Sequence, residues 1–285
     1  MRKLINRLFK RGPVVPVVRM SGVIGAGGPL RPGLSLNTVA ASLDRAFAMA
    51  RDGAVAIQIN SPGGSAVQSR LIFQRVRDLA REKNVRVYIF AEDVAASGGY
   101  MIACAADEIH ADPSSIVGSI GVLYSGFGLT GAIEKLGIDR RVHTAGEKKM
   151  ALDMFQPENP DDIARLKNIQ RVIHKDFIDL VRDRRGRKIE ASGDNLFTGE
   201  FWSGRQALEL GLIDGIMDLR TKMRELYGDK VRLRLVSAER GLFRWRTPGL
   251  WSALDVSMAG PAAMSIADDA ISAIEARAIW ARFGL

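Results

Sequence analysis

Two glycine-rich turns carry the residue types that could perform acyl-transfer chemistry. One is Asn60-Ser61-Pro62-Gly63-Gly64-Ser65 and the other is Ala95-Ala96-Ser97-Gly98-Gly99-Tyr100. Each follows an apolar run that predicts a buried strand, Val55 to Ile59 and Val85 to Ala91, and each opens a segment with helical spacing. A strand that ends in such a turn leaves unpaired backbone N–H groups at the helix start, where partial positive charge suits an oxyanion.

The small neighbours of Ser97 make its hydroxyl a candidate nucleophile. Only Ala and Gly flank it, so a substrate backbone can approach closely. Strand, glycine-rich turn and helix describe any α/β protein, and a single such turn is usually structural. Two of them in adjacent βα units are more informative, because ligands of α/β folds bind at the carboxyl ends of the strands. The pattern predicts a serine hydrolase.

The general base is less certain from the residue types, because the chain has only three histidines. A conventional triad needs a histidine to accept the serine proton. His110 lies in a short strand pattern and is predicted to be structural, and His174 is predicted on the solvated face of a charged amphipathic helix. His143 precedes Lys148 and Lys149 in an extended stretch and is the histidine least easily dismissed. A Ser/Lys dyad is the other route, since desolvation can lower the pKa of a lysine from about 10.4 toward neutrality.

Five motifs in a fixed order resemble the signal peptide peptidase A (SppA, protease IV) family of Ser/Lys serine peptidases. The resemblance covers residues 14–236 and has the half-length form, in which the serine motif and the lysine motif each occur once. The motifs are Ser61-Pro62-Gly63-Gly64, Ala96-Ser97-Gly98-Gly99-Tyr100, Val117-Gly118-Ser119-Ile120-Gly121-Val122, Thr144-Ala145-Gly146-Glu147-Lys148-Lys149, and Gly204-Arg205-Gln206-Ala207 with Gly211-Leu212-Ile213-Asp214.

The resemblance implies a role for each candidate site residue. Ser97 is the nucleophile and Lys149 the general base, and Ser119 helps to orient that lysine. The backbone N–H groups of Gly64 and Gly98 form the oxyanion hole, and the absence of a Cβ lets both amides approach the oxyanion. Adjacent residues of an extended segment point to opposite faces, so only one of the two lysines can face the serine. The family register favours Lys149.

The resemblance also implies the fold and the assembly. We expect an α/β fold of the ClpP/crotonase-like class, a spiral of βα units with a helical arm for oligomerisation. The partners are then peptide substrates and further copies of the chain in a ring, a tetramer or an octamer. The two catalytic residues come from one chain or meet across a subunit interface. The substrates implied are short or unfolded peptides, among them signal peptide remnants at the membrane.

Three alternatives stay open beside the Ser/Lys peptidase. A crotonase-type coenzyme A thioester enzyme also uses paired backbone amides, but it needs neither the serine nor the lysine. A catalytically inactive scaffold on the peptidase fold is the alternative without an enzyme activity. A ClpP-type triad would require a histidine where this chain has Val122.

Composition sets the outer limits. The chain has 285 residues and 47% hydrophobic content, enough for one peptidase domain over residues 13–236 between a tail at 1–12 and an extension of unassigned role at 237–285. The single cysteine, Cys104, is predicted to be a small core residue without a disulfide partner in the chain. The motifs require no cofactor and no metal.

The net charge of +9 raises the question of a polyanionic partner. Nucleic acid is not expected, because the basic residues are spread along the chain without an aromatic recognition motif. Residues 2–11 place four apolar side chains on one helical face with cations around it, which favours peripheral contact with an anionic membrane. No apolar run reaches transmembrane length, so we expect a cytoplasmic protein without a transmembrane helix, peripheral on the inner face of the plasma membrane.

Periodicity predicts the remaining elements. Pro13 to Val18 reads as an opening strand, and Leu36 to Arg51 as an amphipathic helix. Pro160 to Arg185 is a long charged helix, Trp202 to Leu210 a shorter helix, and Gly211 to Ile216 a returning strand.

Overall fold

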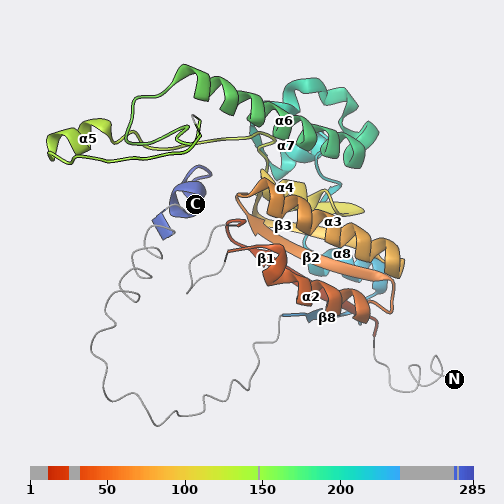
Figure 1. Cartoon of the computed structure of the whole chain (residues 1–285). Helices are drawn as coiled ribbons and strands as arrows, with labels where there is room; N and C mark the ends of the chain where they lie inside the picture. Colours follow the sequence, from red (N-terminus) through yellow and green to blue (C-terminus); the bar gives the residue numbers. More distant parts are fainter. Residues whose placement is uncertain (1–11, 26–32, 147, 238–272, 275) are drawn as a thin grey trace, which may run out of the picture.

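A mixed β-sheet with helices on both faces forms the body of the protein, and this confirms the expected α/β class (Figure 1). The computed structural model describes residues 12–25, 33–146, 148–237, 273–274 and 276–285. Within these residues the sheet order is β6-β5-β3-β2-β1-β8, with β4 paired to β3 and β7 paired to β4. The strands are β1 (Val14–Ser21), β2 (Ala54–Ser61), β3 (Arg86–Ala96), β4 (Glu108–Ala111), β5 (Ile116–Gly118), β6 (Phe201–Ser203), β7 (Gly215–Ile216) and β8 (Arg232–Leu235).

The long central strand β3 organises the sheet. One edge pairs in parallel with β2, and the other edge pairs first with β4 and then, nearer its carboxyl end, with β5. All the strand pairs are parallel except β5 with β6. Parallel pairing brings the carboxyl ends of β2, β3 and β5 to one edge, where the two glycine-rich turns begin.

The helices divide between the two faces of the sheet. Val87 and Ile89 of β3 point into the larger core with α2, α3, α4 and α6, whereas Tyr88 and Phe90 pack with Leu219 of α8 on the other face. In Figure 1, α2 and α3 lie in front of the sheet and α6 lies above it. The helices are α2 (Leu36–Met49), α3 (Ala66–Lys83), α4 (Gly98–Ala103), α5 (Thr130–Lys135), α6 (Pro160–Arg185), α7 (Gly204–Glu209) and α8 (Leu219–Tyr227), with a 3-10 segment η1 (Gly186–Phe197).

The long helix α6 has the predicted bounds because both of its ends are marked in the sequence. The Asn159 side chain accepts a hydrogen bond from Asp161 N at 2.9 Å, and Pro160 occupies the first helical position. Gly186 follows the last residue with a φ of 52°. The helix predicted to follow Ser97 is much shorter than the apolar run suggested: α4 ends at Ala103, and the chain turns toward β4.

The prediction of a helix from Trp202 to Leu210 is wrong at its start. Trp202 and Ser203 belong to β6, where Trp202 pairs with Val117 of β5. Helix α7 begins at Gly204 because Ser203 and Gln206 cap its first turn reciprocally. The returning strand is also shorter than predicted, since β7 spans only Gly215–Ile216.

Parts of the predicted tail and extension lie outside the described residues, among them residues 1–11, which include the segment predicted to contact a membrane, and residues 238–272. Residues 276–281 are helical, and Phe283 behind them is buried against Val94 and Ala96 of β3. None of the helices that the structure describes combines the length and apolar character needed to cross a membrane.

A buried ion pair fastens the end of α6 to the sheet. The guanidinium of Arg185, which is 4% exposed, meets both carboxylate oxygens of Asp214 at 2.9 and 3.0 Å. Asp214 also accepts hydrogen bonds from Ile109 N at 2.8 Å and from Lys188 Nζ at 2.6 Å. Burial alone would raise the pKa of the Asp214 carboxyl, but hydrogen bonding and charge from Arg185 and hydrogen bonds from Lys188 and Ile109 outweigh it and lower the pKa to about 2.

We predict that Asp214→Asn destabilises the protein at pH 7 by about 3 kcal/mol, because it leaves the buried Arg185 charge uncompensated. The pKa of the carboxyl is depressed in the folded state, so its stabilisation is complete above the unfolded pKa of about 3.9 and is lost as the pH falls toward 2. The free energy of unfolding, measured by urea denaturation, should therefore differ most between wild type and variant at neutral pH.

The matched control is Asp194→Asn, since the ion pair of Asp194 with Arg182 is exposed to solvent. We expect this change to alter stability by less than about 0.5 kcal/mol. Equal stabilities of the Asp214 variant and wild type at pH 7 would contradict the importance of the buried pair.

Candidate active site

The two glycine-rich turns lie against each other. Ser61 pairs with Ala95 across β2 and β3, so the turns follow neighbouring strand ends. A Cβ added to Gly63 would lie 2.8 Å from the Cβ of Ser97 and 3.0 Å from Gly98 N. Gly63 has a φ of 104°, which L side chains rarely adopt. Glycine is thus required at this point by both space and backbone conformation.

Ser97 occupies a strained junction between β3 and α4. Its φ and ψ are 53° and −121°, in a region that non-glycine residues avoid. The junction is held on both sides: Ser97 N donates to Gly118 O at 2.7 Å, and Ser97 O accepts from Met101 N at 3.0 Å. The residue is half-buried, whereas Gly98, Gly99 and the rest of α4 are buried. A strained strand-to-helix turn of this kind projects a serine hydroxyl away from the backbone.

Two backbone amides beside Ser97 are unpaired. Among the residues that the structure describes, neither Gly64 N nor Gly98 N donates a hydrogen bond to another group of the protein. Both positions exclude a side chain, because a Cβ would lie 2.2 Å from Ile24 O at Gly64 and 2.3 Å from the Ser69 hydroxyl at Gly98. Close packing against Ile24 and Ser69 therefore fixes the two turns, and the two N–H groups can still donate to a ligand.

Ser119 emerges next to Ser97. Ala96 of β3 pairs with Gly118 of β5, so the residues that follow them leave the sheet side by side. Ser119 is 6% exposed, has a φ of 53°, and donates its backbone N–H to Glu200 O at 2.7 Å. The structure thus brings four of the five predicted site residues to one edge of the sheet.

Lys149 lies apart from these four residues. It is exposed, and its side chain makes no hydrogen bond or ion pair with any described residue. It belongs to the arm, residues 122–159, which extends sideways from the sheet between β5 and α6 and carries α5 at its far end (Figure 1). The expectation of an extended segment here is wrong: residues 148–152 form turns, and Lys149 N donates to Gly146 O at 3.2 Å. The alternation of side chains along a strand therefore does not decide which of the two lysines faces Ser97.

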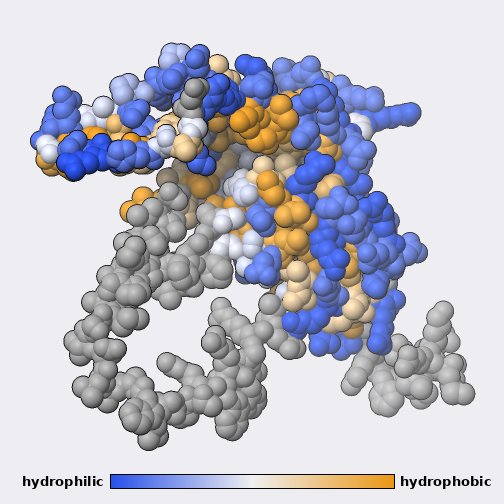
Figure 2. All heavy atoms as spheres, in the orientation of Figure 1, coloured by the Kyte–Doolittle hydropathy of each residue, from blue (hydrophilic) through white to orange (hydrophobic). Residues whose placement is uncertain are grey.

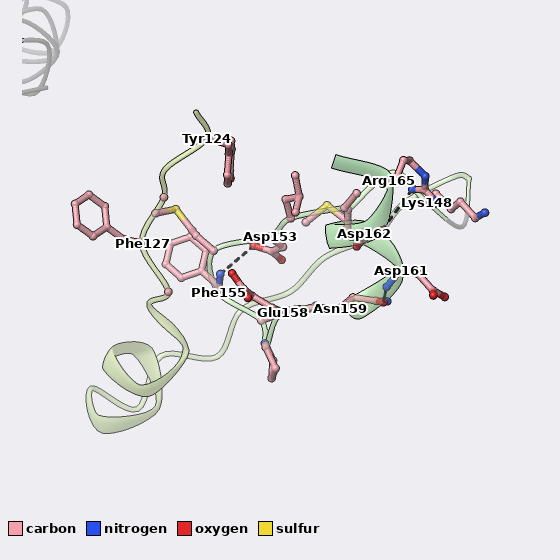
Figure 3. A pocket seen from close by; sticks show the side chains of 18 of the residues that line it. Tyr124, Phe127, Lys148, Asp153, Phe155, Glu158, Asn159, Asp161, Asp162 and Arg165 are labelled. Carbon is pink, nitrogen blue, oxygen red and sulfur yellow. Dashed lines mark hydrogen bonds and ion pairs between the residues drawn. The ribbon is translucent and has the colours of Figure 1, made fainter. Parts of the chain in front are cut away.

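A cavity of about 1090 Å³ lies within the arm and at the start of α6 (Figure 3). Its wall contains an ion pair between Arg140 and Asp153, and the Arg140 guanidinium lies 4.8 Å from the centre of the Phe155 ring. Lys148 is part of the lining, but Ser97 and Ser119 are not. The cavity is therefore separate from the serine turn.

One of the three histidines takes the place predicted for it. His110 is 3% exposed, its Nε2 lies 3.3 Å from a Glu108 carboxylate oxygen, and its ring stacks on Phe90. Burial lowers the pKa of His110, so the neutral ring is part of the core and the structural interpretation is confirmed. His143 is exposed on the arm.

His174 does not lie on a solvated face as predicted. It is half-buried, and its Nε2 lies 3.0 Å from Ile120 O, one residue beyond Ser119. Its spacing contained the signal for this position, because His174 is three residues before Phe177, which is buried on the inner face of α6. Cys104 is buried as predicted, and burial raises the pKa of its thiol to about 12.

The chain is similar to several peptidases. The model of Peptidase family S49 matches residues 79–231. A putative protease of Synechocystis is 31% identical, and the match covers 69% of this chain and 72% of that protein. A putative signal peptide peptidase SppA of Enterococcus faecium is 32% identical, with 57% of this chain and 46% of that protein covered.

A relative with higher identity carries a different name. A Brucella abortus protein named Na(+)/H(+) antiporter NhaA is 52% identical over 291 residues, which cover 100% of this chain. This chain spans only 39% of that protein's length. Among solved structures, the 1510-N membrane-bound stomatin-specific protease aligns with 17% identity and a TM-score of 0.49, over 80% of this chain and 99% of that one.

The resemblance drawn from the five motifs is confirmed by the family model, which covers more than half of the chain. The sheet of consecutive βα units agrees with the ClpP/crotonase-like class that the resemblance implies. This chain belongs to peptidase family S49.

Proposed function

We propose that the protein is a serine endopeptidase in which Ser97 is the nucleophile. The observation that carries the proposal is the contact between the two glycine-rich turns, one with the strained Ser97 and each with an amide, Gly64 N or Gly98 N, that donates to no described residue. Attack of the Ser97 hydroxyl on a peptide carbonyl creates a tetrahedral intermediate with a negatively charged oxygen. Two fixed N–H donors stabilise that charge, and one such donor is typically worth about 3 kcal/mol.

The proton balance requires a base and an acid. The amine of Lys149 takes the proton of the Ser97 hydroxyl as the C–O bond forms, and the resulting ammonium gives a proton to the leaving amine as the C–N bond breaks. A water molecule, deprotonated by the same lysine, then attacks the acyl carbon, and as the ester C–O bond breaks the lysine returns that proton to Ser97 Oγ. We assign to Ser119, whose strand ends beside that of Ser97, the orientation of the lysine amine.

We infer that another copy of the chain supplies the lysine. Lys149 is exposed on the arm, and the arm extends away from the sheet that holds Ser97. Large apolar side chains are also exposed on the arm, and Figure 2 shows hydrophobic patches among its hydrophilic atoms. These residues are Leu123, Tyr124, Phe127, Leu136 and Ile138. A ring of identical copies would bury this surface and complete each site from a neighbour.

The substrates we propose are short or unfolded peptides, because a ring shields its sites from folded proteins. The relative in Enterococcus faecium is named as a putative signal peptide peptidase, and the same class of substrate is our proposal here. The protein from Brucella is named as an antiporter, which favours work at a membrane for this chain too.

Ser97→Ala should abolish peptidase activity without unfolding the protein, because it removes the attacking oxygen and leaves little void. We expect kcat on an unstructured apolar peptide to fall at least about 1000-fold. A fluorophosphonate probe should label wild type at Ser97 and should not label the variant. Ser114→Ala, at an exposed serine, is the matched control. Unchanged turnover by the Ser97 variant would show that Ser97 is not the nucleophile.

Lys149→Ala should reduce kcat as severely as Ser97→Ala, because the nucleophile then has no proton acceptor. Lys148→Ala is the paired control and should retain most of the activity. The comparison uses the same peptide assay on both variants, with circular dichroism to verify folding. The reverse order of effects would assign the base to Lys148.

A complementation experiment tests whether the dyad forms between subunits. Ser97→Ala and Lys149→Ala chains with different affinity tags are co-expressed and purified through both tags. In a ring with the lysine supplied by a neighbour, about a quarter of the sites combine an intact serine with an intact lysine, and activity returns to about that fraction of wild type. A dyad within one chain would give no recovery, because every chain lacks one member.

A further inference from the structure

The turn from Gly118 to Gly121 is held in place by backbone contacts on two sides. Gly118 O accepts from Ser97 N, and Ser119 N donates to Glu200 O, both at 2.7 Å. Trp202 covers the turn, since a Cβ at Gly118 would lie 2.7 Å from its ring. These contacts determine where Ser119 leaves the strand, but they all involve the part of the turn up to Ser119.

Beyond Ser119, Gly121 N donates to Ser119 O at 3.0 Å, and His174 supplies the side-chain contact. Its Nε2 lies 3.0 Å from Ile120 O, and Ile120 has a fully buried side chain. A carbonyl oxygen only accepts, so Nε2 carries the proton of this hydrogen bond. The helix that presents His174 is itself fixed, because Phe177 and Val181 on the same face are buried in the core.

The bond matters because Ser119 is strained. A φ of 53° at a serine persists only where the surroundings over-determine it. Without the His174 donor, the Ile120 carbonyl would lose this hydrogen bond in largely buried surroundings. The turn would then change its backbone conformation so that the carbonyl finds another donor. Relaxation would move Ser119 and, through Gly118 O, the backbone of Ser97.

We propose that His174 is a positioning residue for the peptidase reaction, which holds the Ser119 turn in its catalytic conformation through the Ile120 carbonyl. The proposal rests on the proposed function, because it gives Ser119 and Ser97 their catalytic roles. His174 itself touches no reacting atom. Its loss should lower kcat and leave KM nearly unchanged, because the geometry of the reacting groups changes and the peptide-binding surface does not.

The test uses two substitutions of similar length that differ in the donor. His174→Met removes the N–H, and His174→Gln keeps an amide N–H close to the position of Nε2. We expect His174→Met to lower kcat about tenfold with KM within about twofold, and His174→Gln to return kcat to within about threefold of wild type. Arg171→Gln, an exposed change one turn earlier on α6, is the control and should leave both constants unchanged.

A spectroscopic measurement stands beside the variants. Histidine labelled with ¹⁵N in the wild-type protein reports whether Nε2 of His174 is protonated and hydrogen-bonded, with His174→Gln used to assign the signal. An unprotonated Nε2 in the neutral ring would overturn the proposal even if His174→Met failed to fold. A folded His174→Met variant with wild-type kcat would also overturn it, and so would equal losses in the Met and Gln variants.

The outcomes separate this inference from the proposed function. Ser97→Ala is assayed with the same peptide. If it retains wild-type kcat, the proposed function fails, whatever the histidine variants do. If Ser97→Ala is inactive and His174→Met keeps full kcat, the peptidase assignment stands and the positioning role alone is wrong.

Discussion

The hydrogen bond from Ser97 N to Gly118 O is the contact on which the rest of the site depends. It continues the pairing of β3 with β5 one residue past the end of β3, and so fixes the direction in which the chain enters α4. On the other edge of β3, pairing with β2 brings the Gly63-Gly64 turn against Ser97. A shift of one residue in either register would turn every side chain of β3 to the opposite face, which the two cores do not permit. The core thus enforces the geometry of the site.

Helix α4 connects the Ser97 turn to a network of hydrogen bonds around Leu212 and Asp214. Tyr100 of α4 is fully buried and donates its hydroxyl to Leu212 O at 2.8 Å, and Arg184 donates to Cys104 O at 2.9 Å. Leu212 stands close in the chain to Asp214, the carboxylate that pairs with Arg185. The strain at Ser97 is therefore opposed by a short, wholly buried helix that is fixed at both ends. Such strain is tolerated only where packing leaves the backbone no alternative.

The sequence predicts those helices and strands whose capping residues or glycine turns agree with the pattern of buried residues. Strands β2 and β3 were predictable from buried apolar runs that end in glycine turns, and α6 from a capping Asn159, Pro160 and a terminal glycine. Trp202 was misassigned because its state is set by antiparallel pairing with Val117, a contact that no local pattern encodes. The extended segment predicted around Lys148 and Lys149 is wrong for a related reason: the arm has few buried residues, so no periodicity indicates its turns. The solvated position predicted for His174 is wrong because the many charged residues of α6 outweigh its spacing from the buried Phe177.

The division of the proposed dyad between a rigid sheet and an exposed arm has a regulatory consequence. The sheet presents a strained serine and two amides that donate to no described residue, whereas the arm presents Lys149 to solvent. Under the proposed function an isolated copy holds a nucleophile without its base, and a copy in a ring holds both. Assembly then acts as the activation step, because oxyanion stabilisation alone leaves the serine proton without an acceptor. Association through the exposed apolar residues of the arm would complete each dyad. A single copy would then cleave no protein, and the ring would keep folded proteins away from its complete sites.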